Sequence, residues 1–366
     1  MDWSFTDEQD QIAALTRQIL ERELTEERMR EAERSGDRYD LRLLETLGEA
    51  GVLGVALPAD AGGGALGLIE ICRVLVECGR TVAPIPAPAA LIGSLAVATF
   101  GSDELKARLL PDLASGSRVV VPALVEDMSL DPASPTTRAE PADGGWLLSG
   151  AKTTVAGGTI ADGFLVPAAT PDGPRVFVVE KDASGVAIER QKVTNTDAEA
   201  IVSLSDARAS DVLEGSDVTP WLVRHLTIAL CAVQLGVLER ALELTAEYSK
   251  TRVQFERPIA TFQAVGQRLA DAYIDVNAVR LTTWQAAWRL SEGLPCTSEI
   301  ATAKFWAADA GHRVAHTAVH VHGGMGIDLD YHLNRYFVAA KRIEFALGGA
   351  TEQLVALGRE LASEPA

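Results

Sequence analysis

The 366-residue sequence is poor in cysteine and in basic side chains. It holds four cysteines and no CxxC pair. This spacing fits neither a zinc site nor a disulfide framework, so we expect buried thiols in a reducing compartment. The 33 basic residues are outnumbered by 51 acidic ones, the net charge is −18, and no block of Lys and Arg stands out. Because nucleic acids and anionic membranes attract clustered positive charge, we expect neither as a partner.

The sequence also has little that resembles a membrane span or a signal peptide. Residues 81–102 carry no charge, but Pro84, Pro86 and Pro88 interrupt their first third. The remaining apolar stretch of about a dozen residues suits a buried core helix better than a membrane span. The first ten residues are polar and acidic, unlike a signal peptide. We therefore expect a cytoplasmic protein.

Three stretches of different character follow one another along the chain. Up to about residue 115, apolar residues recur at helical spacing, as at Ile12, Leu15 and Ile19. Short runs rich in Val and Phe follow, such as 176–179, which indicate a small antiparallel barrel or sandwich. Long Ala-rich helical stretches then return. We predict an α+β protein with an N-terminal helical domain at 1–115, a middle β domain at 116–212 and a C-terminal four-helix bundle domain at 213–366.

Two segments of the last stretch carry a family resemblance. One runs from Tyr248 to Gln263 and reads YSKTRVQFERPIATFQ, and the other is VHGGMGI at 321–327. Together they resemble the C-terminal domain of acyl-CoA dehydrogenases, whose pattern is TRxQFGxPIxxFQ followed by GGxG. Weaker likenesses, at 57–63 and 101–116, extend the resemblance over nearly the whole chain. It implies the three-domain fold of that family and FAD as the cofactor.

The resemblance also implies which residues bind the cofactor. Arg252 stands at the family's pyrophosphate position, where a guanidinium fork matches two phosphate oxygens. Phe255 and Gln263 match positions that line the adenosine half, and the glycine pair lets the backbone approach closely. In the family these groups reach the flavin of a neighbouring subunit, which implies an oligomer. The implied cofactor-binding residues are Arg252, Phe255, Gln263, His320, Gly323 and Gly324.

Three histidines of the last stretch invite a metal interpretation. His312, His316 and His320 are spaced by four residues, so on a helix they share one face. No Cys accompanies them at helical spacing, and the family uses no metal. His320 instead matches a position where the family often has a Gln near the cofactor. We predict no metal site.

The family's catalytic base is missing at both of its known positions. The reaction removes the α-proton of an acyl-CoA thioester with a Glu, while a hydride leaves Cβ for the flavin. That Glu lies in a pattern like YEGTSQIQ, and Gly348 stands in its place here. Other members carry the base at the start of a C-terminal-domain helix, where this chain has His225 or Leu226. We therefore expect no catalytic residue in this chain.

The middle domain departs from the family where the flavin ring would bind. The family uses a TEPxxGSD loop and a WITN strand end, whose Thr and Trp meet the ring. At the matching places Val125 and Ala156 lack the hydroxyls, and Thr154 replaces the Trp. Lys152 and Asp162 keep the surrounding frame.

These losses resemble one subunit type of the two-subunit acyl-CoA dehydrogenases of actinobacteria, which are α2β2 tetramers acting on steroid side-chain thioesters. In those enzymes one subunit type holds the flavin ring and the Glu, and the other completes the adenosine half. The resemblance implies that this chain is the second type. It implies a catalytic acyl-CoA dehydrogenase subunit as partner, a bulky acyl-CoA as substrate and an electron-transferring flavoprotein as acceptor.

Two alternatives remain open at this point. The chain could be a self-sufficient homotetrameric dehydrogenase with a displaced base. Glu344 and Glu352 each lie four residues from Gly348, about one turn on a helix. It could instead be a flavin-free relative that only scaffolds or binds acyl-CoA, since fold does not fix function. The retained phosphate fork and glycine pair argue against that second alternative.

Overall fold

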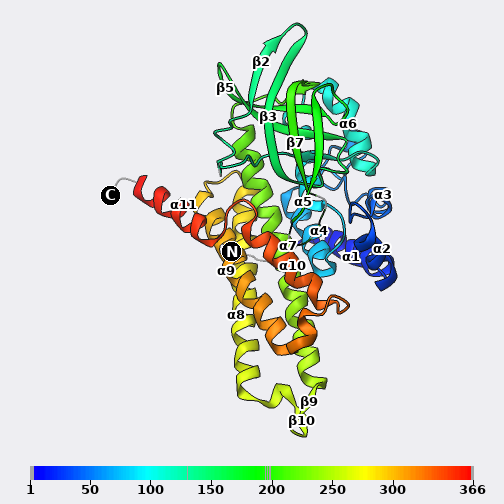
Figure 1. The fold of residues 1–366 in the computed structure, drawn as a ribbon, viewed down its shortest axis with the longest axis vertical. Helices are drawn as coiled ribbons and strands as arrows, with labels where there is room; N and C mark the ends of the chain where they lie inside the picture. Colours follow the sequence, from blue (N-terminus) through cyan, green and yellow to red (C-terminus); the bar gives the residue numbers. More distant parts are fainter. Residues whose placement is uncertain (1–3, 130, 194, 196, 198, 364–366) are drawn as a thin grey trace. The chain divides into compact units, whose positions relative to one another are not determined.

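The computed structural model describes residues 4–129, 131–193, 195, 197 and 199–363. Helices come first, strands follow and helices return (Figure 1), so the predicted α+β order is confirmed. By its internal contacts the chain separates into two compact units. Unit 1 comprises the chain up to Ile71 with Pro84–Leu226, and unit 2 comprises Cys72–Ala83 with Thr227–Ala366. The boundaries predicted for three domains stay a prediction.

The helices of unit 1 begin where the sequence offers caps. Thr6 accepts a hydrogen bond from the backbone N–H of Gln9, whose side chain accepts one from the backbone N–H of Thr6, which is a capping box. The side chains of Asp40 and Ser102 cap later helices by accepting a hydrogen bond from the backbone N–H of Leu43 and Leu105. The helical elements are α1 (Asp7–Glu23), α2 (Glu26–Arg34), α3 (Leu41–Glu49), η1 (Ala59–Ala61), α5 (Ala87–Phe100) and α6 (Asp103–Ser115). The uncharged stretch 81–102 thus contains a buried helix, as predicted.

The strands of unit 1 form one eight-stranded sheet. Its order is β6-β7-β3-β2-β4-β5-β8, and β1 pairs with β4. Most neighbours are antiparallel, but β1 and β2 each run parallel to β4. The strands are β1 (Val120–Pro122), β2 (Arg138–Ala142), β3 (Gly145–Ala156), β4 (Gly163–Thr170), β5 (Gly173–Glu180), β6 (Val186–Gln191), β7 (Glu199–Arg208) and β8 (Asp211–Val212).

Long helices make up unit 2, and two helices continue from one unit into the other. Those two are α4 (Leu68–Thr81) and α7 (Val218–Thr251). The other elements are β9 (Val253–Gln254), β10 (Arg257–Pro258), η2 (Ile259–Thr261), α8 (Gln263–Ser291), α9 (Thr297–His322), η3 (Gly323–Ile327), α10 (Leu333–Phe345) and α11 (Ala350–Ser363). Figure 1 shows β9 and β10 at the lower tip of this unit, where α7 ends and α8 begins.

Small residues let the helices of unit 2 approach closely. A Cβ on Gly79 would lie 2.1 Å from the Val233 carbonyl oxygen, and one on Gly236 would lie 2.0 Å from that of Val76. Helix α7 is long and apolar enough to cross a membrane, but 72% of its most apolar 18-residue window is buried within the protein. That burial is the character of a core helix.

Candidate functional site

Several of the predicted cofactor residues lie around one tip of unit 2. Arg252 directly follows α7, Phe255 lies in the turn between β9 and β10, and Gln263 begins α8. All three side chains are exposed. The Arg252 backbone N–H donates to the Tyr248 carbonyl at 2.9 Å, while its guanidinium forms no ion pair within the described part of the chain. A free, exposed guanidinium on a fixed backbone is what a phosphate-binding Arg requires.

The β9–β10 hairpin holds Phe255 in solvent. Phe255 and Glu256 have φ angles of 51° and 65°, so both adopt the left-handed conformation of a tight hairpin turn. The Phe255 side chain is 87% exposed. Its only described ring contact is edge-on to Phe262, at 6.2 Å between centroids, and Arg257 lies over the other ring at 4.2 Å. An apolar ring held out in this way is suited to cover a planar group from outside the chain.

Backbone geometry accounts for the glycines at 323–326. Gly323 has φ 66° and ψ −141°, a region that essentially only glycine adopts. A Cβ on Gly324 would meet nothing within 4 Å, whereas one on Gly326 would lie 2.9 Å from Val319. The turn therefore leaves open backbone at Gly324 and needs glycine at 326, a position that the sequence interpretation did not single out although it lies in the same motif.

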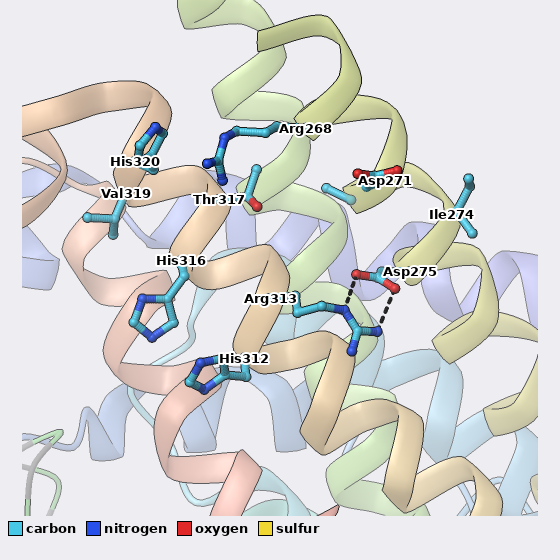
Figure 2. Close-up of a pocket in the computed structure, with 11 residues that line it drawn as sticks. Arg268, Asp271, Ile274, Asp275, His312, Arg313, His316, Thr317, Val319 and His320 are labelled. Atoms are coloured by element: carbon cyan, nitrogen blue, oxygen red, sulfur yellow. Dashed lines mark hydrogen bonds and ion pairs between the residues drawn. The ribbon is translucent and has the colours of Figure 1, made fainter. Parts of the chain in front are cut away.

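His320 also lines a groove between α8 and α9 (Figure 2). The groove has a volume of about 750 Å³. In Figure 2 the Arg268 side chain extends from α8 toward α9. The Arg313 guanidinium donates two hydrogen bonds, of 2.8 and 2.7 Å, to the Asp275 carboxylate. The lining residues are Arg268, Asp271, Ala272, Ile274, Asp275, His312, Arg313, His316, Thr317, Val319 and His320. The three histidines do share a face, as their spacing predicted, but the described residues contain no group of three or more side chains able to hold a metal.

The position of the missing base has a backbone conformation that favours glycine and close neighbours in α11. Gly348 has φ 91°, and the residue before it, Leu347, has φ 55°. A Cβ on Gly348 would lie 3.2 Å from the Glu352 Cβ and 3.0 Å from the Gln353 Nε2. The Gln353 amide donates to the Leu347 carbonyl at 3.2 Å. A side chain at 348 would thus point into the first turn of α11 from a strained backbone.

Lys304 contacts the end of α10, a few residues before Gly348. Its side chain is fully buried, and Nζ donates to the Ile343 and Glu344 carbonyls at 3.0 and 3.1 Å. Burial lowers the pKa of Lys304 to about 8. These carbonyls end α10, where a cation satisfies groups that the helix leaves without partners.

The two candidate displaced bases differ in their surroundings. The Glu344 carboxylate accepts a bond of 2.6 Å from Lys341 Nζ and lies 3.3 Å from His312 Nδ1. Glu352 is exposed at the start of α11. Helix α10 ends at Phe345 and α11 begins at Ala350, so the assumption of one helical turn between each Glu and Gly348 is wrong.

The second family position for the base holds a neutral, buried ring. His225 is buried, its Nδ1 lies 2.8 Å from the Trp221 carbonyl oxygen, and its ring stacks on the Trp221 ring at 3.7 Å. Burial lowers the pKa of His225 to about 4. The neighbouring position, Leu226, has no ionisable group.

The frame around the flavin-ring position is intact, although its contact groups are not. Glu126 forms a buried ion pair with Lys152 at 2.6 Å. Burial alone would raise the pKa of Glu126, but hydrogen bonds from Lys152, Thr136 and Thr137 lower it to about 2. Asp162 accepts from the Val119 backbone N–H and from Lys181.

The residues at the flavin-ring position do not supply the hydroxyls and the Trp of the family pattern. Thr154 has φ 49°, and its backbone N–H donates to the Gln191 side chain at 2.8 Å. Val125 and Ala156 offer no hydroxyl. The residues present therefore fit the dinucleotide half of FAD at the tip of unit 2, but they fit its ring poorly in unit 1.

Comparison with known proteins identifies the family. Residues 214–361 match the profile "Acyl-CoA dehydrogenase, C-terminal domain" and residues 6–117 match "Acyl-CoA dehydrogenase, N-terminal domain". Acyl-CoA dehydrogenase FadE27 of Mycobacterium tuberculosis is 44% identical over 377 residues, covering all of both chains. Among solved structures, a chain of the ChsE4–ChsE5 complex of M. tuberculosis has a TM-score of 0.96 at 44% identity, with full coverage of both chains. A variant of the Tcur3481–Tcur3483 steroid ACAD has a TM-score of 0.93 at 42% identity, covering 97% of this chain and 98% of that one.

Proposed function

This chain belongs to the acyl-CoA dehydrogenase family, and we propose that it completes the FAD site of a catalytic partner subunit without supplying the base. The assembly would be an α2β2 oxidoreductase that desaturates an acyl-CoA thioester at Cα and Cβ. One observation carries the proposal: the position of the family's glutamate is a glycine with φ 91°, and a side chain there would point into α11. FAD, the predicted cofactor, is confirmed as that of the family and is proposed for this chain.

Each half of the proposed assembly has its own task. When bound, FAD takes up the hydride that leaves Cβ. The partner's carboxylate would take the α-proton. In this chain Arg252 would bind the pyrophosphate oxygens, Phe255 and Gln263 would line the adenosine, and the open backbone at Gly324 would admit the dinucleotide. His320, exposed on α9, would donate or accept beside it.

The proposed partners follow from the relatives that match over the full chain. The structures named above are a two-protein complex and a steroid ACAD. This supports a distinct acyl-CoA dehydrogenase chain as partner and a bulky steroid side-chain thioester as substrate. With that substrate the enzyme would act in lipid and steroid β-oxidation. We also propose a cytoplasmic location and an electron-transferring flavoprotein as acceptor, as the family resemblance implies.

The experiment measures bound FAD by visible absorption in this chain purified alone, and again after co-expression with acyl-CoA dehydrogenase chains that retain the glutamate. We expect a colourless single chain and about one flavin per two chains in the co-purified pair, because only one chain of each pair has the ring-binding groups. One flavin per chain in the protein alone would overturn the proposal.

A self-sufficient enzyme with a displaced base is the second candidate. Substituting Glu344→Gln and Glu352→Gln separately in the purified single chain tests it. The candidate requires that wild-type chain alone turns over acyl-CoA and that one of the two variants does not. The Lys341 contact speaks against Glu344, because its carboxylate already accepts a hydrogen bond from Lys341 Nζ.

A further inference from the structure

Three aromatic rings, of Tyr248, His322 and Tyr331, form a stack in unit 2 that we call the ring stack. The Tyr248 and His322 centroids are 4.2 Å apart with an angle of 22° between the planes. His322 and Tyr331 are 5.5 Å apart at 51°. Tyr248 lies near the end of α7, His322 ends α9, and Tyr331 follows η3. The ring stack therefore joins the end of α7 to the end of α9 and the residues after η3, which are more than 70 residues away in sequence.

His322, at the centre of the stack, is fixed more by its rings than by hydrogen bonds. Its side chain is 4% exposed, and Nδ1 lies 2.8 Å from the Ala318 carbonyl oxygen within its own helix. Nε2 is buried and has no hydrogen-bond partner among the described residues. A buried polar atom without a partner costs free energy, so a purely structural core would favour an apolar residue at this position. The histidine must be compensated by the two rings against it.

Tyr248 and His322 lie next to the proposed FAD residues. Tyr248 is one helical turn before Arg252, whose N–H donates to the Tyr248 carbonyl at 2.9 Å. His322 directly precedes Gly323, and the Tyr248 hydroxyl lies 3.9 Å from the Met325 sulfur inside η3. The stack thus connects the backbone that carries the guanidinium with the backbone that would face the same dinucleotide.

We propose that the ring stack is a positioning device for the dinucleotide half of FAD: it fixes the Arg252 segment against the Gly323–Gly324 turn before the cofactor binds. The inference rests on the proposed function. Recognition of a pyrophosphate by a guanidinium and a backbone turn together requires their relative placement to hold within a fraction of an ångström. A platform ordered in advance also avoids the entropy of ordering two segments on binding.

The first test needs no FAD. Hydrogen exchange of the amides at 323–327 is compared in the wild-type chain, in Tyr248→Leu, in Tyr248→Phe, and in Tyr273→Leu as a matched control on an exposed tyrosine of α8. We expect exchange to rise roughly 3- to 10-fold in Tyr248→Leu, as the loss of an aromatic pair predicts. Tyr248→Phe and Tyr273→Leu should resemble wild type. Unchanged exchange in Tyr248→Leu, or an equal rise in the control, overturns the proposal.

The second test measures FAD release from the co-purified pair by the recovery of flavin fluorescence. Tyr248→Leu and Tyr331→Leu should each release FAD several-fold faster than the wild-type pair, and Tyr248→Phe should not. The double variant should be no worse than the poorer single variant, because either change breaks the same stack. Multiplying effects in the double variant would overturn the coupling. If no wild-type pair binds FAD, the proposed function fails, while the exchange experiment still decides the stack.

Discussion

At residue 348 the loss of the family carboxylate is accompanied by a backbone that would not display one. The left-handed φ of Gly348 and the closeness of Glu352 act together there. Substituting a glutamate at residue 348 would therefore not by itself restore a catalytic base. Because this effect depends on the backbone conformation of residue 348, a substitution at that residue tests it.

We predict that Gly348→Glu lowers the stability of the chain by about 1–3 kcal/mol and yields no dehydrogenase activity in the chain alone, because an L-residue is strained at this φ. The thermal midpoint and acyl-CoA turnover measure the two effects. Gly358→Glu, in α11 with open space around it, is the matched control and should be neutral or stabilising. Turnover by Gly348→Glu would contradict the prediction.

His225 makes the stability of unit 1 sensitive to acid. Its pKa is lowered by burial to about 4 from 6.5, so between these values the unfolded chain binds a proton that the folded chain does not. The free energy of unfolding therefore falls as pH decreases through this window, by about 3 kcal/mol in total. His225→Phe should keep the stacking on Trp221 and flatten the pH dependence. Thermal midpoints of both proteins at pH 7 and pH 4.5 measure this, and equal slopes would contradict it.

At the scale of elements, the β9–β10 hairpin is built with an unfavourable turn. Two-residue hairpin turns of this kind favour Asn-Gly because both residues have positive φ, yet Phe255 and Glu256 occupy these places. The family pattern has glycine at the position of Glu256. The hairpin therefore keeps a strained residue beside the exposed Phe255 ring.

We predict that Glu256→Gly stabilises the chain by about 1 kcal/mol, because glycine adopts a positive φ without steric cost. The thermal midpoint should rise accordingly. Gln254→Gly, in the extended strand β9 of the same hairpin, is the control and should lower it. A lower midpoint for Glu256→Gly would mean that the carboxylate contributes more than the strain costs.

At the scale of the whole molecule, apolar side chains remain uncovered on unit 2. On α8, Tyr273, Ile274 and Leu281 are 61%, 63% and 63% exposed, and Ile274 and Leu281 are seven residues apart, on one face of the helix. Such a stripe is costly in water and typical of a surface covered in an assembly. It agrees with the proposed heteromer.

We predict that the double variant Ile274→Glu and Leu281→Glu weakens co-purification with the partner at least about tenfold, because buried charges oppose assembly. The thermal midpoint of the chain alone should stay unchanged. Leu41→Glu, at a 49%-exposed residue of α3, is the control and should co-purify normally. Pull-down at several concentrations measures the effect, and equal recovery of all variants would exclude the stripe from the interface.

The sequence by itself determined what depends on local pattern and on residue identity. Helical spacing and the Arg252 and Gly323 motifs indicated the order of elements, the family and its cofactor. The missing base at Gly348 could also be read directly, because chemistry that needs a carboxylate cannot proceed from glycine.

Only the tertiary structure decided what depends on contacts between distant residues. The contact of Glu344 with His312, the burial of His225 and the stacking of Tyr248 on His322 have no signature in local sequence. The turn that separates α10 from α11 likewise replaced the helix assumed around Gly348. Packing in three dimensions sets burial, backbone φ and partner choice, and these decide whether an ionisable side chain can act as a base.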